Sequence, residues 1–459
     1  MRASVPTPAE FRALVRLAVP VVVVQLGLML MGVVDTLMVG HLSARALAAV
    51  ALGNLYFFTI AIAAIGTLMA LDPLIAQAVG AGDEPAIARG LQRGLVLALL
   101  GSVPVCLALA VVRPVLALAG EPEELLDPAA SYIRVIIPGI LPFLVFVVFR
   151  QTLQALRRIA PIVAVTLAAN LLNAGLNWAF IFGHLGSPAL GVAGAALATS
   201  ISRWVMAGAL LAAGWGTLGP RLRPWRGEAW DPGALGRMLR VGLPIGGQMF
   251  LEYGIFALVG ALMGRIGTLA LGGHQIALNL AALVFMVPQG TGAATAVLVG
   301  HAIGAEDPAL ARRSAAAGLM LGGGFMAGSA AVFLLAPGFL AGLYTPDLAV
   351  QAVARPLIAL AGVFAVFDGL QAVAIGILRG IGDTRAPVVI SMLGYWLIGL
   401  PASLLLGFGL AMGPPGLWWG LVLGLVVTAA ILLARVRVRL RGRIHRLLVD
   451  HPVPVADGS

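Results

Sequence analysis

Four acidic residues lie inside long apolar stretches of this sequence, where a charge is costly. Asp35 lies late in the first stretch, Glu252 and Asp368 lie near the middle of later ones, and Asp72 lies towards the end of the second. A charge at the centre of a bilayer costs about 2.5–3.5 kcal/mol on insertion scales, so acids in such positions are candidates for binding cations or protons. We assign this role to the first three and interpret Asp72 as a group reached by water or a loop partner.

Carboxamide side chains recur at helical spacing, and some share a face with these acids. Residues three or four apart lie on one face of a helix. The pairs and triplets with this spacing are Gln248 with Glu252, Asp368 with Gln371, Gln275 with Asn279, and Asn170 with Asn173 and Asn177. Amides in an apolar helix must face protein or water. The amides that share a helix face with an acid predict a polar site. For the other amides, the alternative is that they only form hydrogen bonds between helices and have no further function.

The composition limits the elements that can position these residues. The chain has 459 residues, of which 60% are hydrophobic and 10% charged, and its mean hydropathy is +1.02. Soluble domains have roughly 25% charged residues. This chain therefore has too few charged residues to form the polar surface of soluble domains. The single cysteine, Cys106, excludes an internal disulfide and a cysteine metal cluster. The composition therefore indicates a membrane protein.

Twelve apolar runs are long enough to cross a bilayer. A transmembrane helix needs about 20 mainly apolar residues, and such runs alternate with short segments rich in Gly, Pro and charge. The predicted spans are 17–39, 50–74, 91–116, 132–153, 161–182, 190–214, 238–263, 276–300, 314–337, 353–378, 387–408 and 416–434. The predicted fold class is an all-α polytopic membrane protein with twelve transmembrane helices.

The arginines predict the orientation of these spans. All 29 basic residues are arginine, and assigning the loops to alternate sides puts 23 on one side and five on the other, with Arg203 inside a span. Short cytoplasmic loops retain positive charge. Both termini are therefore predicted to be cytoplasmic, with the protein in the inner (cytoplasmic) membrane. Because topology explains the basic run 435–443, we expect no nucleic-acid partner.

The chain contains an internal repeat. An offset of about 224 residues aligns Pro20 with Pro244 and the Gly-Ala pair at 80–81 with that at 304–305. Each pair lies at the same point of a six-span half, which predicts two pseudo-symmetric lobes related as a parallel repeat. The deep acids are not duplicated, so we expect the lobes to be specialised. The predicted parts are an N-terminal lobe 1–220, a cytoplasmic loop 221–240, a C-terminal lobe 241–436 and a basic tail 437–459.

Seven motifs are spread over both halves, and they are specific together rather than singly. They are Asp35-Thr-Leu-Met-Val-Gly-His, Gln77-Ala-Val-Gly-Ala-Gly, Asn170-x-x-Asn173-x-x-x-Asn177 with Phe180-Ile-Phe-Gly, Gly194-Ala-Ala-Leu-Ala-Thr199, the segment from Gly242-Leu-Pro to Glu252, His274-Gln-Ile-Ala-Leu-Asn279, and Asp368 before Arg379-Gly-Ile-Gly-Asp-Thr-Arg. Through them the chain resembles the NorM-like bacterial branch of the multidrug and toxic compound extrusion (MATE) transporters. The resemblance implies a V-shaped pair of six-helix lobes that exports organic cations in exchange for Na⁺ or H⁺.

The resemblance also implies roles for residues at matching positions. A cation site in the N-terminal lobe would consist of Asp35, Asn173, Asn177 and Thr199. Glu252 and Asp368 match the acids of the C-terminal lobe. Asn177 stands where some relatives have a second aspartate, and Phe364 stands where some Na⁺-coupled members have a tyrosine. The coupling ion is therefore open between Na⁺ and H⁺, and no cofactor or further metal is expected.

An amphiphilic cation would be drawn to acidic cavity walls and held by apolar and aromatic contacts. The candidate cavity residues are Gln25, Asn170, Gln248, Tyr253, Gln275, Asn279, Phe364 and Gln371. Export requires that ion and drug favour opposite-facing states. The predicted function is secondary active multidrug efflux, not catalysis, by a protein that acts as a monomer in the bilayer.

Three other functions are less consistent with the sequence. A flippase for lipid-linked precursors needs arginines to hold pyrophosphate, and Arg203 alone is central. An integral-membrane enzyme acting on lipids needs a metal or histidine motif, which the six histidines do not form. A passive channel does not require a duplicated, asymmetric scaffold. We expect Arg203 to pair with an acid, since an isolated buried guanidinium is costly.

Overall fold

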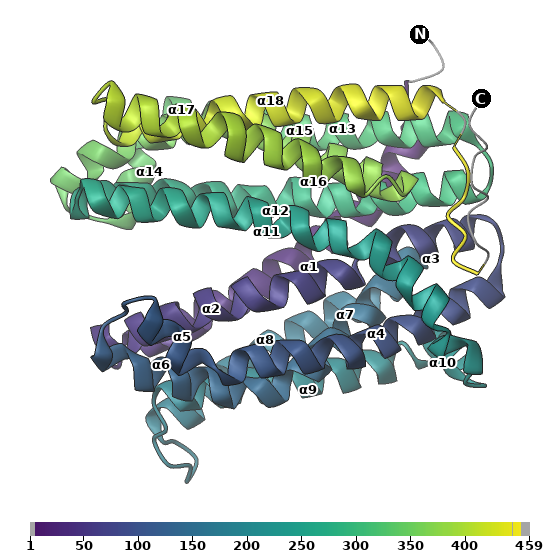
Figure 1. Cartoon of the computed structure of the whole chain (residues 1–459), viewed down its shortest axis with the longest axis horizontal. Helices are drawn as coiled ribbons and strands as arrows, with labels where there is room; N and C mark the ends of the chain where they lie inside the picture. The colour runs from purple at the N-terminus through teal and green to yellow at the C-terminus, as the bar shows by residue number, and fades with distance from the viewer. Residues whose placement is uncertain (1–4, 443, 451–459) are drawn as a thin grey trace. The chain divides into compact units, whose positions relative to one another are not determined.

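The computed structural model describes residues 5–442 and 444–450, and these residues form helices and connecting turns without a β-strand (Figure 1). The first half contains α1 (Pro8–Gly40), α2 (Ala44–Leu68), α3 (Leu71–Gly80), α4 (Glu84–Ala110), α5 (Val112–Leu118), α6 (Glu123–Ile136), α7 (Ile140–Ala155), α8 (Ala160–Phe182), α9 (Val192–Ala213) and α10 (Trp215–Leu222). The second half contains α11 (Pro232–Ile266), α12 (Thr268–Gly304), α13 (Pro308–Leu335), α14 (Pro337–Tyr344), α15 (Leu348–Ile381), α16 (Arg385–Ser391), α17 (Leu400–Leu404) and α18 (Pro414–Arg441).

Twelve helical segments of the described chain are long and apolar enough to cross a membrane, which confirms the predicted all-α fold with twelve spans. Three of these segments are composite. The span Ala44–Gly80 joins α2 and α3 through a turn at residues 69–70. The span Glu123–Ala155 joins α6 and α7 through a 3₁₀ turn at Ile137–Gly139, which contains a proline. The span Arg385–Gly409 contains π-helical turns on both sides of α17, where Pro401 lacks the amide hydrogen that would continue an α-helical ladder.

The described residues form two compact units. Unit 1 comprises 5–22, 80–82, 247–442 and 444–447, and unit 2 comprises 23–79, 83–246 and 448–450. These units cross the predicted lobe limits because α1 and α11 are long helices whose two ends pack in different units. Within unit 1, for example, Glu10 accepts a hydrogen bond from Arg313 at 2.7 Å. The division into lobes at 220 and 240 stays a prediction.

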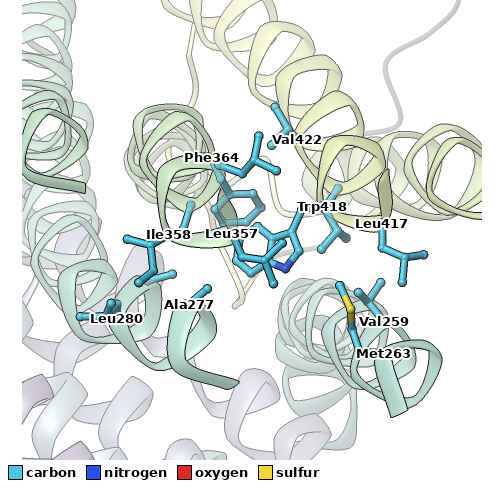
Figure 2. Packing of buried hydrophobic residues seen from close by; sticks show 14 of the residues in the cluster. Val259, Met263, Ala277, Leu280, Leu357, Ile358, Phe364, Leu417, Trp418 and Val422 are labelled. Carbon is cyan, nitrogen blue, oxygen red and sulfur yellow. The ribbon is translucent and has the colours of Figure 1, made fainter. Parts of the chain in front are cut away.

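Unit 1 has its core around α15, which packs against α12, α13 and α18. Figure 2 shows the interior of this unit, where Phe364 and Trp418 lie among aliphatic side chains such as Leu357. α12 and α15 approach so closely that a Cβ atom on Gly376 would collide with the backbone of Gly292. Small residues at such a contact let helix backbones pack directly against each other in a membrane.

Unit 2 is built from contacts of α9 with α6, α7 and α8, and of α2 with α4 and α6. Inside it, the hydroxyl of the buried Tyr132 donates to Asn54 Oδ1 at 2.9 Å and joins α6 to α2. Gly66 of α2 packs against the backbone of Gly246 in α11, with no room for a Cβ atom. These contacts fix the helices that carry the polar residues of the first half.

The repeat is visible in the turns that follow the second span of each half. Asp83 caps α4 by accepting from the amide of Ala86 at 3.0 Å, and Asp307 caps α13 by accepting from Leu310 at 2.8 Å. Each new helix has a proline in its first turn, a position where proline is favoured because no amide hydrogen is needed. The same local chemistry therefore starts the third span of both halves.

Residues 448–450 belong to unit 2 and are held within it through a carboxylate. Asp450 accepts hydrogen bonds from Arg89 Nη2 at 2.7 Å and from Arg93 Nη1 at 2.6 Å, and Arg237 Nε donates to the carbonyl of Val449 at 2.5 Å. Burial raises the pKa of Asp450, but the hydrogen bonds and charges of the two arginines outweigh it, so this pKa lies below its ordinary value. The negative charge of Asp450 therefore holds residues 448–450 against Arg89 and Arg93.

Candidate functional site

The structure brings Asp35, Asn173, Asn177 and Thr199 together inside unit 2, and we call these four residues the Asp35 cluster. They come from three helices, α1, α8 and α9. Asn177 Nδ2 donates to Asp35 Oδ1 at 2.5 Å and to Asn173 Oδ1 at 3.2 Å. Thr199 Oγ1 donates to Asp35 Oδ2 at 2.8 Å. Each carboxylate oxygen is therefore held by a hydrogen bond from another helix.

The Asp35 cluster is shielded from solvent and contains unsatisfied polar atoms. Asp35 is 4% exposed and both asparagines are fully buried. Asn177 Oδ1 and Asn173 Nδ2 are buried with no hydrogen-bond partner. An unpartnered carbonyl oxygen beside a carboxylate fits a cation, because hard cations prefer oxygen ligands. A carboxylate whose hydrogen-bond partners are neutral equally suits a proton, since burial disfavours its charged form.

Two residues predicted to line a cavity have other contacts in the same unit. Asn170 lies two turns before Asn177 on α8, and its amide donates to the carbonyls of Gly27 and Thr166, both at 2.9 Å. Asn170 therefore joins α8 to α1 instead of entering the Asp35 cluster. Gln25 accepts a hydrogen bond from Arg150 Nη1 at 3.0 Å.

A second polar group, which we call the Glu252 network, lies in unit 1. Glu252 Oε2 accepts from Gln248 Nε2 at 2.6 Å, and Glu252 Oε1 accepts from Gln371 Nε2 at 3.1 Å. The Tyr395 hydroxyl donates to Gln371 Oε1 at 2.9 Å. The buried Asp368 lies on α15 three residues before Gln371, and the negative charge of Glu252 acts on it. The structure thus brings both predicted acids of the second half into one electrostatic site.

Sequence reasoning missed Tyr395. Its side chain is fully buried and it is the hydroxyl donor that orients Gln371. It belongs to the π-helical turn Met392–Gly399. The available signal was a lone tyrosine inside the apolar run 387–408, which no acid or amide accompanies at helical spacing.

Four further cavity candidates lie outside the Glu252 network. Phe364 is 2% exposed and packs edge to face against Trp418, at 5.9 Å between ring centroids (Figure 2). It packs in the same way against Phe256, at 5.8 Å. Its position is that of a core residue. Gln275 and Asn279 lie one turn apart on the exposed side of α12, and Tyr253 is half-buried on α11. The assignment of these four residues to a substrate cavity stays a prediction.

The structure corrects the expectation for Arg203. No carboxylate of the described chain forms an ion pair with it; instead its guanidinium lies between the rings of Phe57 and Phe143, 4.6 and 4.7 Å from their centroids. Stacking on aromatic faces suits a planar, weakly hydrated cation. Asp72, interpreted from the sequence as a group reached by water or a loop partner, is instead buried in the first turn of α3 and interacts electrostatically with Arg150 of α7. In residues 5–442 and 444–450, no three His, Cys, Asp or Glu side chains form a group that could hold a metal ion.

Comparison with known proteins identifies the family. The family model MatE matches residues 20–179 and 244–405, that is, both halves of the chain. The chain is 40% identical over 437 residues to the probable multidrug resistance protein NorM of Rhizobium meliloti, covering 93% of this chain and 92% of that protein. It is 37% identical over 434 residues to the multidrug resistance protein PmpM of Pseudomonas aeruginosa, covering 93% and 91%.

The chain therefore belongs to the MatE family, the MATE transporters, and resembles its NorM-like bacterial members. The fold agrees. The crystal structure of the eukaryotic MATE transporter AtDTX14 superposes with a TM-score of 0.86 at 23% identity, covering 94% of this chain and 98% of that one.

Proposed function

We propose that this chain is a multidrug efflux transporter that exports amphiphilic organic cations in exchange for Na⁺ or H⁺. The observation that carries the proposal is the Asp35 cluster, in which a carboxylate buried within a membrane-spanning unit is held by neutral amide and hydroxyl groups. Relatives that are 34–40% identical are named multidrug resistance proteins, which supports drug export as the transported function.

The Asp35 cluster supplies the features that coupling requires. A carboxylate without a fixed ion-pair partner gains a large stabilisation when a cation or proton enters. Na⁺ would contact oxygens of Asp35, Asn177 and Thr199, whereas a proton would need the carboxylate alone. Such a ligand drives export only if it binds more tightly to one orientation of the carrier than to the other, and the drug must favour the opposite one.

The Glu252 network is the proposed attraction for the drug. Two carboxyl groups that act on each other in one buried site, Glu252 and Asp368, repel and are relieved when a positive charge approaches. We propose that an organic cation or the coupling ion supplies this charge. The arginine distribution supports an orientation with both termini in the cytoplasm, so export would run from that side.

The flippase alternative has less support. Pyrophosphate recognition relies on several guanidinium groups that bind phosphate oxygens. In the described chain Arg203 is stacked between two phenylalanine rings, whereas Asp35, Glu252 and Asp368 contribute negative charge.

The test is ethidium efflux from proteoliposomes under an imposed Na⁺ gradient or an imposed pH gradient. We expect wild-type protein to transport under one of the two gradients and Asp35→Asn to lose this transport. Asp127→Asn is the matched control, because it neutralises an exposed aspartate that pairs with Arg113 at 2.7 Å away from the cluster. Transport by wild type under neither gradient, or an unaffected Asp35→Asn variant, would contradict the proposal.

A further inference from the structure

Arg203 lies beside the Asp35 cluster without being part of it. On α9 it follows Thr199 by four residues, so the two side chains lie on the same helix face one turn apart. Arg203 is 9% exposed and its Nη1 atom is buried without a hydrogen-bond partner. A permanent positive charge is thus enclosed within the same unit as Asp35.

The surroundings of Arg203 are aromatic rather than acidic. The guanidinium carbon lies over the ring of Phe57 of α2 and over the ring of Phe143 of α7. From α6, Tyr132 faces the same region, but its hydroxyl donates to Asn54 Oδ1. The carboxylate whose charge acts on Arg203 is Asp35, and no ion pair joins the two in the described residues. The rings therefore hold the guanidinium in place at a distance from the carboxylate.

This separation has a consequence for the charge of the site. If Asp35 were the only charge, binding of a monovalent cation would neutralise the site completely. With Arg203 nearby, the empty site is neutral overall, and the bound cation adds a charge that Arg203 repels. At a separation of about 10 Å and an effective dielectric constant of about 20, two unit charges change a binding constant by roughly tenfold. The repulsion by Arg203 therefore favours release of the bound cation from the Asp35 cluster.

We propose that Arg203 is a positioning residue for coupling: held by Phe57 and Phe143, its fixed charge weakens cation binding at the Asp35 cluster so that the cation can leave. This inference rests on the function proposed above. An exchanger that binds its coupling ion too tightly cannot release the ion on the other side of the membrane. The ion promotes turnover only if the two orientations of the carrier bind it with different affinities. Arg203 would set the upper limit of that affinity.

The experiment measures the concentration of the coupling cation that gives half-maximal ethidium efflux in proteoliposomes. Na⁺ is varied at fixed pH, and H⁺ is varied without Na⁺. Arg203→Met keeps an apolar stem between the rings and removes the charge, Arg203→Gln is a second neutral variant if the first does not fold, and Arg203→Lys keeps the charge. Arg45→Met is the matched control, because Arg45 donates at the protein surface to the carbonyl of Glu124.

We expect the half-maximal concentration to fall about tenfold in the neutral variants and to stay within about twofold of wild type in Arg203→Lys and Arg45→Met. A purely structural role would instead lower the maximal rate in the lysine and neutral variants alike and leave the half-maximal concentration unchanged, which would overturn the inference. If Asp35→Asn abolishes the cation dependence while neutral Arg203 variants behave like wild type, only the role of Arg203 is refuted. If Asp35→Asn keeps the wild-type cation dependence, the proposed function fails and the role of Arg203 fails with it.

Discussion

Replacing Thr199 with valine removes one hydroxyl from the Asp35 cluster with little change in side-chain shape. In the structure this hydroxyl donates to Asp35 Oδ2 at 2.8 Å, while Asn177 continues to hold Oδ1. A hydrogen bond to a charged group contributes about 1.5–3 kcal/mol, and about 1.4 kcal/mol corresponds to a tenfold change in a binding constant. The substitution should therefore change cation affinity about tenfold or more.

The direction of the change depends on the coupling ion. The hydroxyl stabilises the ionised form of Asp35, so its loss makes protonation easier, and a proton-coupled transporter should reach half-maximal efflux at about a tenfold lower H⁺ concentration. A Na⁺-coupled transporter loses one oxygen ligand instead, because Thr199 would contact the ion directly. Its half-maximal Na⁺ concentration should rise. The sign of the shift therefore identifies the ion.

The assay is ethidium efflux from proteoliposomes, with Thr199→Val and wild type compared over a range of Na⁺ at fixed pH and over a range of pH without Na⁺. Thr152→Val is the matched control: this buried threonine belongs to the same unit, but its hydroxyl donates to the carbonyl of Val148 in its own helix at 2.9 Å. We expect no shift in the control. Unchanged half-maximal concentrations of both ions in Thr199→Val would refute the reasoning that this hydroxyl acts on the coupling site.

Two further predictions concern the Glu252 network and the C-terminal segment. Tyr395→Phe leaves Gln371 Oε1 buried without its hydroxyl donor, which costs about 1–3 kcal/mol, so we expect thermal unfolding of the purified protein to occur a few degrees lower. The pKa of Asp450 lies below its ordinary value because the hydrogen bonds and charges of Arg93 and Arg89 outweigh the effect of burial. Docking of 448–450 is therefore fully stabilised above the ordinary aspartate pKa of about 3.9 and is lost as the pH falls through the lowered pKa, and Asp450→Asn should raise hydrogen exchange in this segment at neutral pH.

Each of these predictions has a control. Tyr253→Phe removes a half-buried hydroxyl that makes no hydrogen bond to a described residue, so its unfolding temperature should match that of wild type; an equal loss in both variants would contradict the role given to Tyr395. For the C-terminal segment, Asp127→Asn should leave hydrogen exchange at 444–450 unchanged. Identical exchange in wild type and Asp450→Asn would show that the carboxylate does not hold the segment.

The sequence predicted the fold well because composition determines it. Twelve long apolar runs separated by Gly, Pro and arginine leave few alternatives to twelve spans, and the structure has twelve such helices in its described residues. The turns at Asp83 and Asp307 show that the repeat detected by aligning prolines and glycines extends to local capping chemistry. These features depend on residues close together in the sequence.

The arrangement of the site was only partly predictable. Asn170, Asn173 and Asn177 share a face of α8, but positions seven residues apart are about 10 Å apart along a helix, so Asn170 reaches Gly27 while Asn177 reaches Asp35. Helical spacing identifies the face and not the partner opposite each turn.

Contacts between distant helices could not be derived from residue spacing, and the grouping of Asp35 with Asn173, Asn177 and Thr199 followed from the family resemblance alone. Phe57 and Phe143 lie far from Arg203 in the sequence, and each is one of many aromatic residues in apolar runs. Tyr395 was missed for the same reason, since its bond to Gln371 depends on how the π-helical turn faces α15. The register between packed helices is set by side-chain fit in three dimensions.

The most direct test of the central claim is to drive the exchange backwards. Proteoliposomes loaded with ²²Na⁺, or with a pH-sensitive dye in Na⁺-free buffer, are given an ethidium gradient as the sole driving force, and the movement of the cation is recorded. If the chain is an antiporter coupled through Asp35, drug entering the vesicles will drive one of the two cations outwards in wild type and in Asp127→Asn, but neither in Asp35→Asn. Cation movement in the same direction as the drug, or drug movement without any cation movement, would contradict the account.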